Sequence, residues 1–206
     1  MQFSKEEELA QVKVQRPHVV ILGAGASLAA LPNGDKNGRK LPLMNNFVEV
    51  LNLSAILHKA NVDFEGKNFE DVYDQLYRDA KYSIIRQELE EAIYDYFSSL
   101  QLPETPTIYD HLALSLREKD VIATFNWDPF LTQAYRRNAK RVKLPRLYFL
   151  HGNVTIGYCA QDKVMGVNWN PCSRCGEPFT PSKLLYPISE KNYHGFISTQ
   201  WKELEH

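Results

Sequence analysis

Three short apolar runs along the chain predict the strands of a sheet. They lie at residues 18–22 (HVVIL), 121–125 (VIATF) and 147–150 (LYFL), and small or polar residues soon follow each of them. Continuous apolar runs of this length, separated by helical stretches, are typical of buried parallel strands. The pattern therefore predicts an α/β fold in which a Rossmann-like, mostly parallel sheet is flanked by helices.

A helical insertion is expected between the first two strands, over residues 43–118. Residues 43–60 have helical character, and two later segments place apolar side chains at spacings of three and four, as a helix with one buried face does. The first set is Phe69, Val72, Tyr73, Leu76, Tyr77 and Ala80, and the second is Ile85, Leu89, Ile93, Tyr96 and Leu100. Residues 31–42 (LPNGDKNGRKLP) combine two Pro, two Gly and two Asn, which predicts a mobile loop.

Composition and charge narrow the classes of partner. The chain has 206 residues, and its 24 Lys and Arg nearly balance its 25 Asp and Glu. A net charge of −1 provides no general attraction to nucleic acid or anionic membranes. The basic run at residues 136–146 is interpreted as a solvated helix end, with a nucleic-acid or protein contact as the alternative.

Targeting signals and cysteine content indicate the compartment. The apolar runs are far shorter than the roughly 20 residues of a membrane-spanning helix, and the first residues do not resemble a signal peptide. Only three Cys are present, which fits a reducing compartment. We therefore expect a cytoplasmic protein without a membrane partner.

The length suits one domain over residues 1–206. Its Rossmann-like core is expected from residues 17–42 and 120–152, with a helical module at 43–118. Residues 153–190 are rich in turn-forming residues and contain all three Cys, so they predict a small module that a metal ion would stabilise.

A glycine-containing turn follows the first predicted strand. Gly23, Ala24, Gly25 and Ser27 lie where bare backbone N–H groups begin a helix, so a diphosphate could approach closely and the Ser27 hydroxyl could add a donor. The fingerprint GxGxxG is incomplete because Leu28 occupies the third glycine position. The alternative is a strand-to-helix turn that needs glycine for its own packing.

Polar residues also follow the second and third strands. Asn126 and Asp128 flank Trp127, and His151 ends the run LYFL. Because ligands bind at the carboxyl ends of parallel strands, these side chains are candidates for catalysis, with His151 suited to act as a base. The alternatives are that Asn126 and Asp128 cap a helix that begins near Pro129 and that His151 is structural.

The three cysteines predict a metal site. Cys172 and Cys175 form a CxxC knuckle, and Cys159 precedes them. Thiolates at this spacing are typical zinc ligands, and a closed site needs a fourth ligand, for which Asp162 and His194 are candidates. The alternative is a set of free, buried thiols.

The order of these motifs resembles that of the sirtuin superfamily, and is closer to bacterial Sir2-like domains of defence proteins. The shared motifs are GAGAS, FNWD, LHG and one CxxC, over about residues 17–176. The resemblance implies that Gly23, Ala24, Gly25 and Ser27 hold the NAD diphosphate. It further implies that Asn126 and Asp128 contact the ribose next to the nicotinamide, that residues 33–42 form a flexible cofactor loop, and that His151 is the catalytic base.

The resemblance implies an NAD hydrolase that releases nicotinamide and ADP-ribose in antiviral defence, within a homo-oligomer or a larger complex. Two alternatives remain open: a module that binds NAD or ADP-ribose or assembles a larger protein without turnover, and an NAD-dependent protein deacylase. The text after Cys175 (GEPFTPSKLLYPISEKNY) departs from the peptide-pairing strand of deacylases. The final QWKELEH suggests a fragment or a tag remnant.

Overall fold

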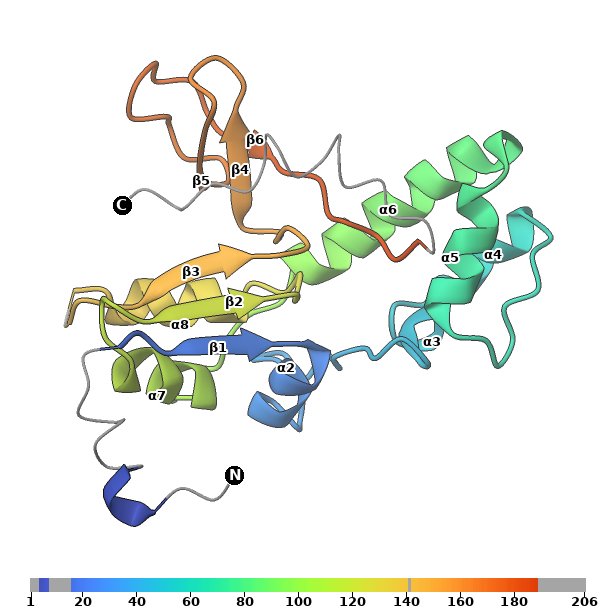
Figure 1. The fold of residues 1–206 in the computed structure, drawn as a ribbon. Helices are drawn as coiled ribbons and strands as arrows, with labels where there is room; N and C mark the ends of the chain where they lie inside the picture. Colours follow the sequence, from blue (N-terminus) through green and yellow to red (C-terminus); the bar gives the residue numbers. More distant parts are fainter. Residues whose placement is uncertain (1–3, 8–15, 141, 189–206) are drawn as a thin grey trace.

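The computed structural model describes residues 4–7, 16–140 and 142–188, and it has a mixed α/β fold (Figure 1). Three parallel strands form the main sheet in the order β1-β2-β3, with Ile21 opposite Ala123 and Ala123 opposite Tyr148. This confirms the predicted parallel sheet with flanking helices. The strands are β1 (Val19–Leu22), β2 (Val121–Thr124) and β3 (Arg146–Phe149).

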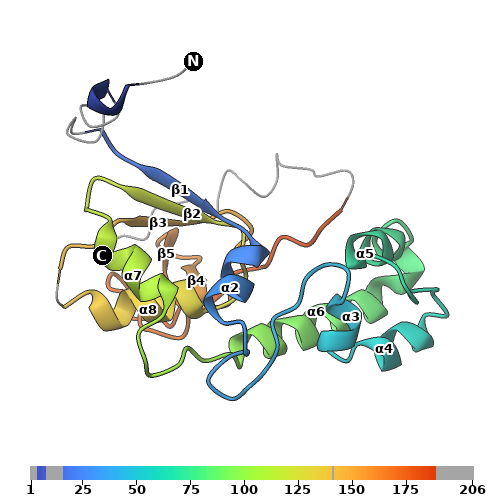
Figure 2. The same ribbon diagram turned by 90° about the horizontal axis from the view of Figure 1, so that it is seen from below.

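Helices cover one face of this sheet. Figure 2 shows the sheet nearly edge-on with three helices on the same side of it. These are α2 (Ala24–Ala30), α7 (Ile108–Ser115) and α8 (Phe130–Asn138). Val20 and Leu22 face the helices, whereas Val19 and Ile21 are 64% and 66% exposed. The prediction of a buried strand is therefore wrong for β1, because β1 is an edge strand that is covered on only one face.

Besides α7, the predicted helical module at residues 43–118 contains four α-helices and a 3-10 turn in the described residues. They are α3 (Phe47–Val50), α4 (Ser54–Lys59), α5 (Phe69–Tyr77), the turn Ala80–Tyr82 and α6 (Ser83–Ser98). The segment 43–60 divides into two helices because Asn52 has a φ of 55°, in the left-handed region that ends a helix. The predicted apolar face is buried at Phe69, Val72, Tyr73 and Leu76, whereas Tyr77 is exposed and Ala80 is exposed in the 3-10 turn beyond α5.

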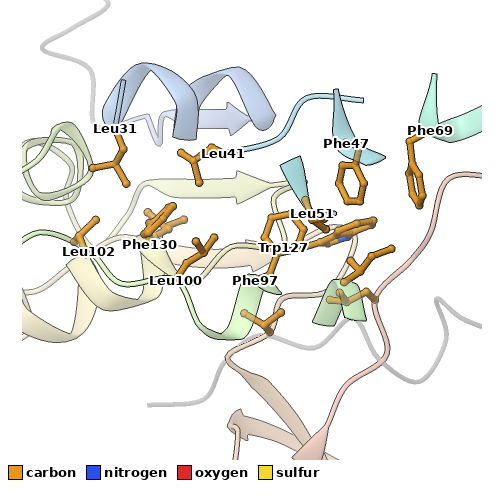
Figure 3. Close-up of a cluster of buried hydrophobic side chains, with 14 of the residues drawn as sticks. Leu31, Leu41, Phe47, Leu51, Phe69, Phe97, Leu100, Leu102, Trp127 and Phe130 are labelled. Carbon is orange, nitrogen blue, oxygen red and sulfur yellow. The ribbon is translucent and has the colours of Figure 1, made fainter. Parts of the chain in front are cut away.

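One hydrophobic core joins the helical module to the end of the sheet. Phe47 stacks on Phe69 at 4.3 Å between ring centroids, and it meets the edge of Trp127 at 6.1 Å. Figure 3 shows these side chains in one continuous cluster with Phe97 and Phe130. The aromatic rings therefore hold the module against the carboxyl ends of the strands.

The loop over residues 31–42 contains no helix or strand, as its composition predicts. The buried carboxylate of Asp35 nevertheless anchors it, since it accepts hydrogen bonds from the backbone N–H groups of Asn37 and Arg39, both at 2.8 Å. It also accepts one from the N–H of Gln101 at 3.0 Å, beyond the end of α6. Any movement of this loop must break these bonds or carry their donors along.

A second, antiparallel sheet lies beyond β3, at the top of Figure 1. Its order is β5-β4-β6, with β4 (Ile156–Cys159), β5 (Val164–Val167) and β6 (Thr180–Pro181). A Cβ atom at Gly157 or Gly166 would come within 2.7 Å or 2.3 Å of the Phe179 side chain, so these positions need glycine. No helix in the described parts of the chain is long and apolar enough to cross a membrane.

Candidate functional site

The carboxyl ends of the three parallel strands meet at one cavity of about 190 Å³. Leu22 and Thr124 are paired, as are Thr124 and Phe149, so the residues that follow each strand emerge at the same edge of the sheet. Five predicted site residues line the cavity: Ala24, Ser27, Asn126, Asp128 and His151. Gly23 directly precedes α2 and Gly25 lies in the first turn of α2, and neither is in the cavity wall.

A buried hydrogen-bond network connects the first two motifs. Ser27 Oγ lies 2.6 Å from Asp128 Oδ2, to which it donates, and 2.6 Å from the hydroxyl of Tyr109. Asn126 Nδ2 donates to Gly23 O at 3.0 Å and to Ser27 Oγ at 2.8 Å. Because the carbonyl of Gly23 can only accept, both protons of the Asn126 amide are committed inside the protein. Oδ1 is therefore the atom that Asn126 can offer to a ligand or a water molecule.

Asp128 combines a structural role with its place in the cavity wall. Its Oδ1 accepts a hydrogen bond from the N–H of Phe130 at 3.2 Å, at the start of α8, although the N-cap position is occupied by Pro129 and not, as predicted, by Asp128. Burial raises the pKa of Asp128 to about 6, and the hydrogen bonds from Ser27 and Phe130 offset only part of this effect. The carboxylate is therefore poised to change its charge slightly below neutral pH.

His151 occupies the third side of the cavity. Its ring meets the ring of Phe125 edge-on at 4.8 Å, and its backbone oxygen accepts a hydrogen bond from Leu185 N–H at 2.9 Å. Gly152, with φ of 76°, allows the close approach of residues 183–185, because a Cβ there would lie 2.7 Å from the oxygen of Lys183. The turn that follows β3 thus presents the imidazole to the cavity.

The fold does not explain the glycines of the first turn. A Cβ atom built at Gly23 or Gly25 meets no atom of the described residues within 4 Å, and neither residue has a positive φ. The interpretation that this turn needs glycine for its own packing therefore finds no support at these two positions. The open space in front of them is instead available to a ligand.

Among the residues of the site that were not predicted from the sequence, three are polar. Tyr109 reaches Ser27 from α7, and Glu70 lines the cavity from the first turn of α5. Asn153 is fully buried, and its side chain donates to the backbone oxygens of Asn126 and Asp128 at 3.2 and 2.7 Å. Only Asn153 carried a local signal, since it directly follows the predicted HG motif.

The three cysteines and Asp162 form a cluster that could hold a metal ion such as zinc. Their four ligand atoms lie within 4.8 Å of one another, with Cys159 Sγ 3.5 Å from Cys175 Sγ. Asp162 Oδ2 lies 3.6 Å from Cys159 Sγ and 3.2 Å from Cys172 Sγ. Two sulfur ligands of a tetrahedral zinc ion are separated by about 3.8 Å, so these spacings fit such an ion. The other candidate for the fourth ligand, His194, lies outside the described residues.

The basic run at residues 136–146 does not form a uniform cationic surface. Arg137 forms an ion pair with the buried Asp110 and donates to the oxygen of Pro103, and Lys143 pairs with Glu118. At least two of its cations are therefore paired with other residues of the chain.

Comparisons with known proteins do not extend this picture. No protein-family model matches the chain, and no curated protein matches it at a significant level. The class of the site consequently has to be argued from its residues.

Proposed function

We propose that the chain is a Sir2-like enzyme with a nucleotide site at the sheet edge. More particularly, we propose that it hydrolyses the bond between nicotinamide and ribose in NAD. The observation that carries this proposal is the single cavity whose wall includes Ser27, Asn126 and His151, one from each strand end. Gly23 and Gly25 support it, because a diphosphate would fit the open space that their missing side chains leave.

The proposed reaction consumes one water molecule. The ribose C1′–N bond breaks with its electron pair going to nicotinamide, the water oxygen bonds to C1′, and one proton is released. His151 would accept that proton, either from the water or from a ribose hydroxyl. Asn126 Oδ1 would orient the same hydroxyl or water, while Ser27 and Asp128 hold the Asn126 amide in place.

The size of the cavity limits what it encloses. A volume of about 190 Å³ is below the roughly 300–1,000 Å³ typical of sites for whole drug-sized ligands. The cavity would therefore surround the ring and ribose at one end of the dinucleotide, with the diphosphate at the glycine turn outside it.

A second candidate is a module that binds NAD or ADP-ribose without turnover. The polar groups of Ser27, Asp128 and the Asn126 amide nitrogen already satisfy one another, as they would in a purely structural network. Calorimetry that detects NAD binding without release of nicotinamide would favour this candidate.

The test is release of nicotinamide from NAD by the purified chain, compared with His151→Ala and Asn126→Ala. Loss of a general base should lower turnover about a hundredfold or more. His111→Ala is the matched control, because His111 is exposed and is not in the cavity wall. Equal turnover by the wild type and His151→Ala would reject the role of His151, and no release by the wild type would reject the hydrolase.

A further inference from the structure

The cavity has a second wall, which the helical module and the residues after β2 supply. Four aromatic residues line it: Phe47, Phe97, Phe125 and Trp127. The rings of Phe47 and Phe97 each meet the ring of Trp127 at an interplanar angle of 89°, with centroids 6.1 and 5.7 Å apart. Figure 3 shows that Phe47, Phe97 and Trp127 gather at one place in the core. This wall is therefore a preformed aromatic surface that suits a flat ligand.

Trp127 also carries an unmet hydrogen-bonding group. The residue is only 6% exposed, and its buried Nε1 has no hydrogen-bond partner among the described residues. A buried donor without an acceptor costs free energy.

Glu70 is an acidic residue of this wall. It lies in the first turn of α5, where its backbone N–H is bonded to the side chain of Asn68. Its own side chain is exposed and has no hydrogen-bond or ion-pair partner within the described parts of the chain. An acidic residue in the wall of a cavity, with no cation of the described residues paired to it, is available to a ligand.

The charges around the cavity favour a cationic ligand. Its wall includes the acids Glu70 and Asp128, and no Lys or Arg among the described residues. Aromatic faces attract a cation through the negative charge of their π-systems, and a nearby carboxylate adds to that attraction. An anionic group such as a phosphate would be repelled from the same place.

We propose that Glu70 and the aromatic wall select a flat, positively charged heteroaromatic ring, with Glu70 as the residue that determines specificity for charge. The identity of the ring rests on the proposed function. The pyridinium ring of oxidised NAD is such a cation, whereas the dihydronicotinamide ring of NADH is neutral and of nearly the same size. Cleavage of the bond to ribose makes the ring neutral, so the attraction that holds the substrate is lost in the product.

The test uses two small rings as probes: 1-methylnicotinamide, which is a cation, and nicotinamide, which is neutral. Calorimetry with the full chain measures the affinity of each for the wild type and for Glu70→Gln. The substitution should weaken binding of the cation about two- to fivefold and leave the neutral ring unchanged. Asp71→Asn is the matched control, because it removes the same charge from the neighbouring exposed residue, which is not in the cavity wall.

The outcomes separate this inference from the proposed function. An unchanged ratio of the two affinities in Glu70→Gln, an equal effect of Asp71→Asn, or failure of both rings to bind would overturn it. If the ratio changes only in Glu70→Gln, the inference holds even when NAD is not hydrolysed. If NAD is hydrolysed but Glu70→Gln discriminates between NAD and NADH as the wild type does, the hydrolase stands and the role of Glu70 fails.

Discussion

The strand-end cavity and the cysteine cluster are both built from polar side chains, yet they are stabilised in opposite ways. At the cavity, Ser27, Asn126 and Asp128 satisfy one another through hydrogen bonds. At the cluster, three thiols and the carboxylate of Asp162 converge, with their ligand atoms within 4.8 Å of one another, and the charge of Arg174 also acts on Asp162. The Asp162 carboxylate raises the pKa of the Cys175 thiol to about 12, so the chain alone opposes thiolate formation there.

The hydrophobic cores beneath the cavity and beneath the cysteine cluster differ in size. The cavity lies over a cluster that contains large, fully buried side chains such as Phe47, Phe69 and Phe130. The buried members of the core around the cysteines are only Cys159, Cys172 and Phe179 in the described residues. A core of this size provides little hydrophobic stabilisation. We therefore expect the folding of the cysteine module to depend on a bound metal ion, and the folding of the parallel sheet not to depend on one.

The largest expected effect is that of removing metal. We expect purified protein to contain about one zinc ion per chain, and chelation or Cys172→Ser to remove it. Structural zinc contributes about 10–16 kcal/mol to folding of isolated zinc fingers, so loss of the ion should unfold the cysteine module. Metal analysis and amide hydrogen exchange would measure both effects. If the backbone amides of β1 and β2 lost their protection from hydrogen exchange as fast as those of β4 and β5, the metal would stabilise both regions, and the contrast between them would be wrong.

The two candidates for the fourth ligand can be separated in the same assay. Asp162→Asn should weaken zinc binding at least about tenfold, because its oxygen is one of the four clustered ligand atoms. His194→Ala should leave zinc affinity unchanged. The reverse result would show that the fourth ligand is His194.

A smaller effect is expected from the titration of Asp128. Its pKa is raised from 3.8 to about 6 by burial, so the folded state binds a proton more tightly than the unfolded state does. The resulting stabilisation is present below pH 4 and is lost as the pH rises through 6. The stability of the wild type relative to Asp128→Asn should therefore fall by up to about 3 kcal/mol between pH 4 and pH 7.

Urea unfolding of both proteins at the two pH values measures this change. Other titrating groups cancel in the difference between the two proteins, so the comparison isolates Asp128. A difference that is constant with pH, or that grows toward pH 7, would show that the buried network does not hold the carboxyl group as described.

Tyr109→Phe should have a more modest effect. The substitution removes the hydroxyl that lies 2.6 Å from Ser27 Oγ, but Ser27 keeps its bonds to Asn126 and Asp128. The expected cost is about 1 kcal/mol in the free energy of unfolding, the typical value of one hydrogen bond. In Tyr96→Phe, the control, the cost should be lower because water can replace the exposed bond to Lys40 O. Equal costs would contradict a special role for the buried network.

Much of the fold could be predicted from local patterns. Apolar runs located all three parallel strands, and spacings of three and four located α5 and α6. The one-sided exposure of β1 could not be predicted, because it depends on which face the helices cover. The break of residues 43–60 at Asn52 was also missed, since most residues in that segment favour a helix.

The residues of the site also fall into those that local sequence patterns predict and those that depend on how distant segments pack. Ser27, Asn126, Asp128 and His151 could be brought together because the ends of parallel strands meet at one edge. Tyr109 could not be found in this way, because its contact with Ser27 spans 82 residues and depends on where α7 packs. The cysteine cluster was predictable from the CxxC spacing, and Asp162 was one of two candidates for its fourth member; its place beside the thiols is settled by the turn between β4 and β5.

The smallest effect on stability, and the sharpest test of the glycine turn, is expected from Gly25→Ala. The residue lies inside α2 with no atom near the added Cβ, so alanine should raise the free energy of unfolding by about 0.5–1 kcal/mol. A ligand that occupies the open space would collide with the same methyl group, so NAD affinity should fall. Urea unfolding and calorimetry measure the two quantities on one protein.

Gly38→Ala is a useful control because its φ of 76° makes alanine strained there, with no ligand involved. If Gly25→Ala binds NAD as the wild type does, the diphosphate does not lie against this turn, whatever the cysteine module binds.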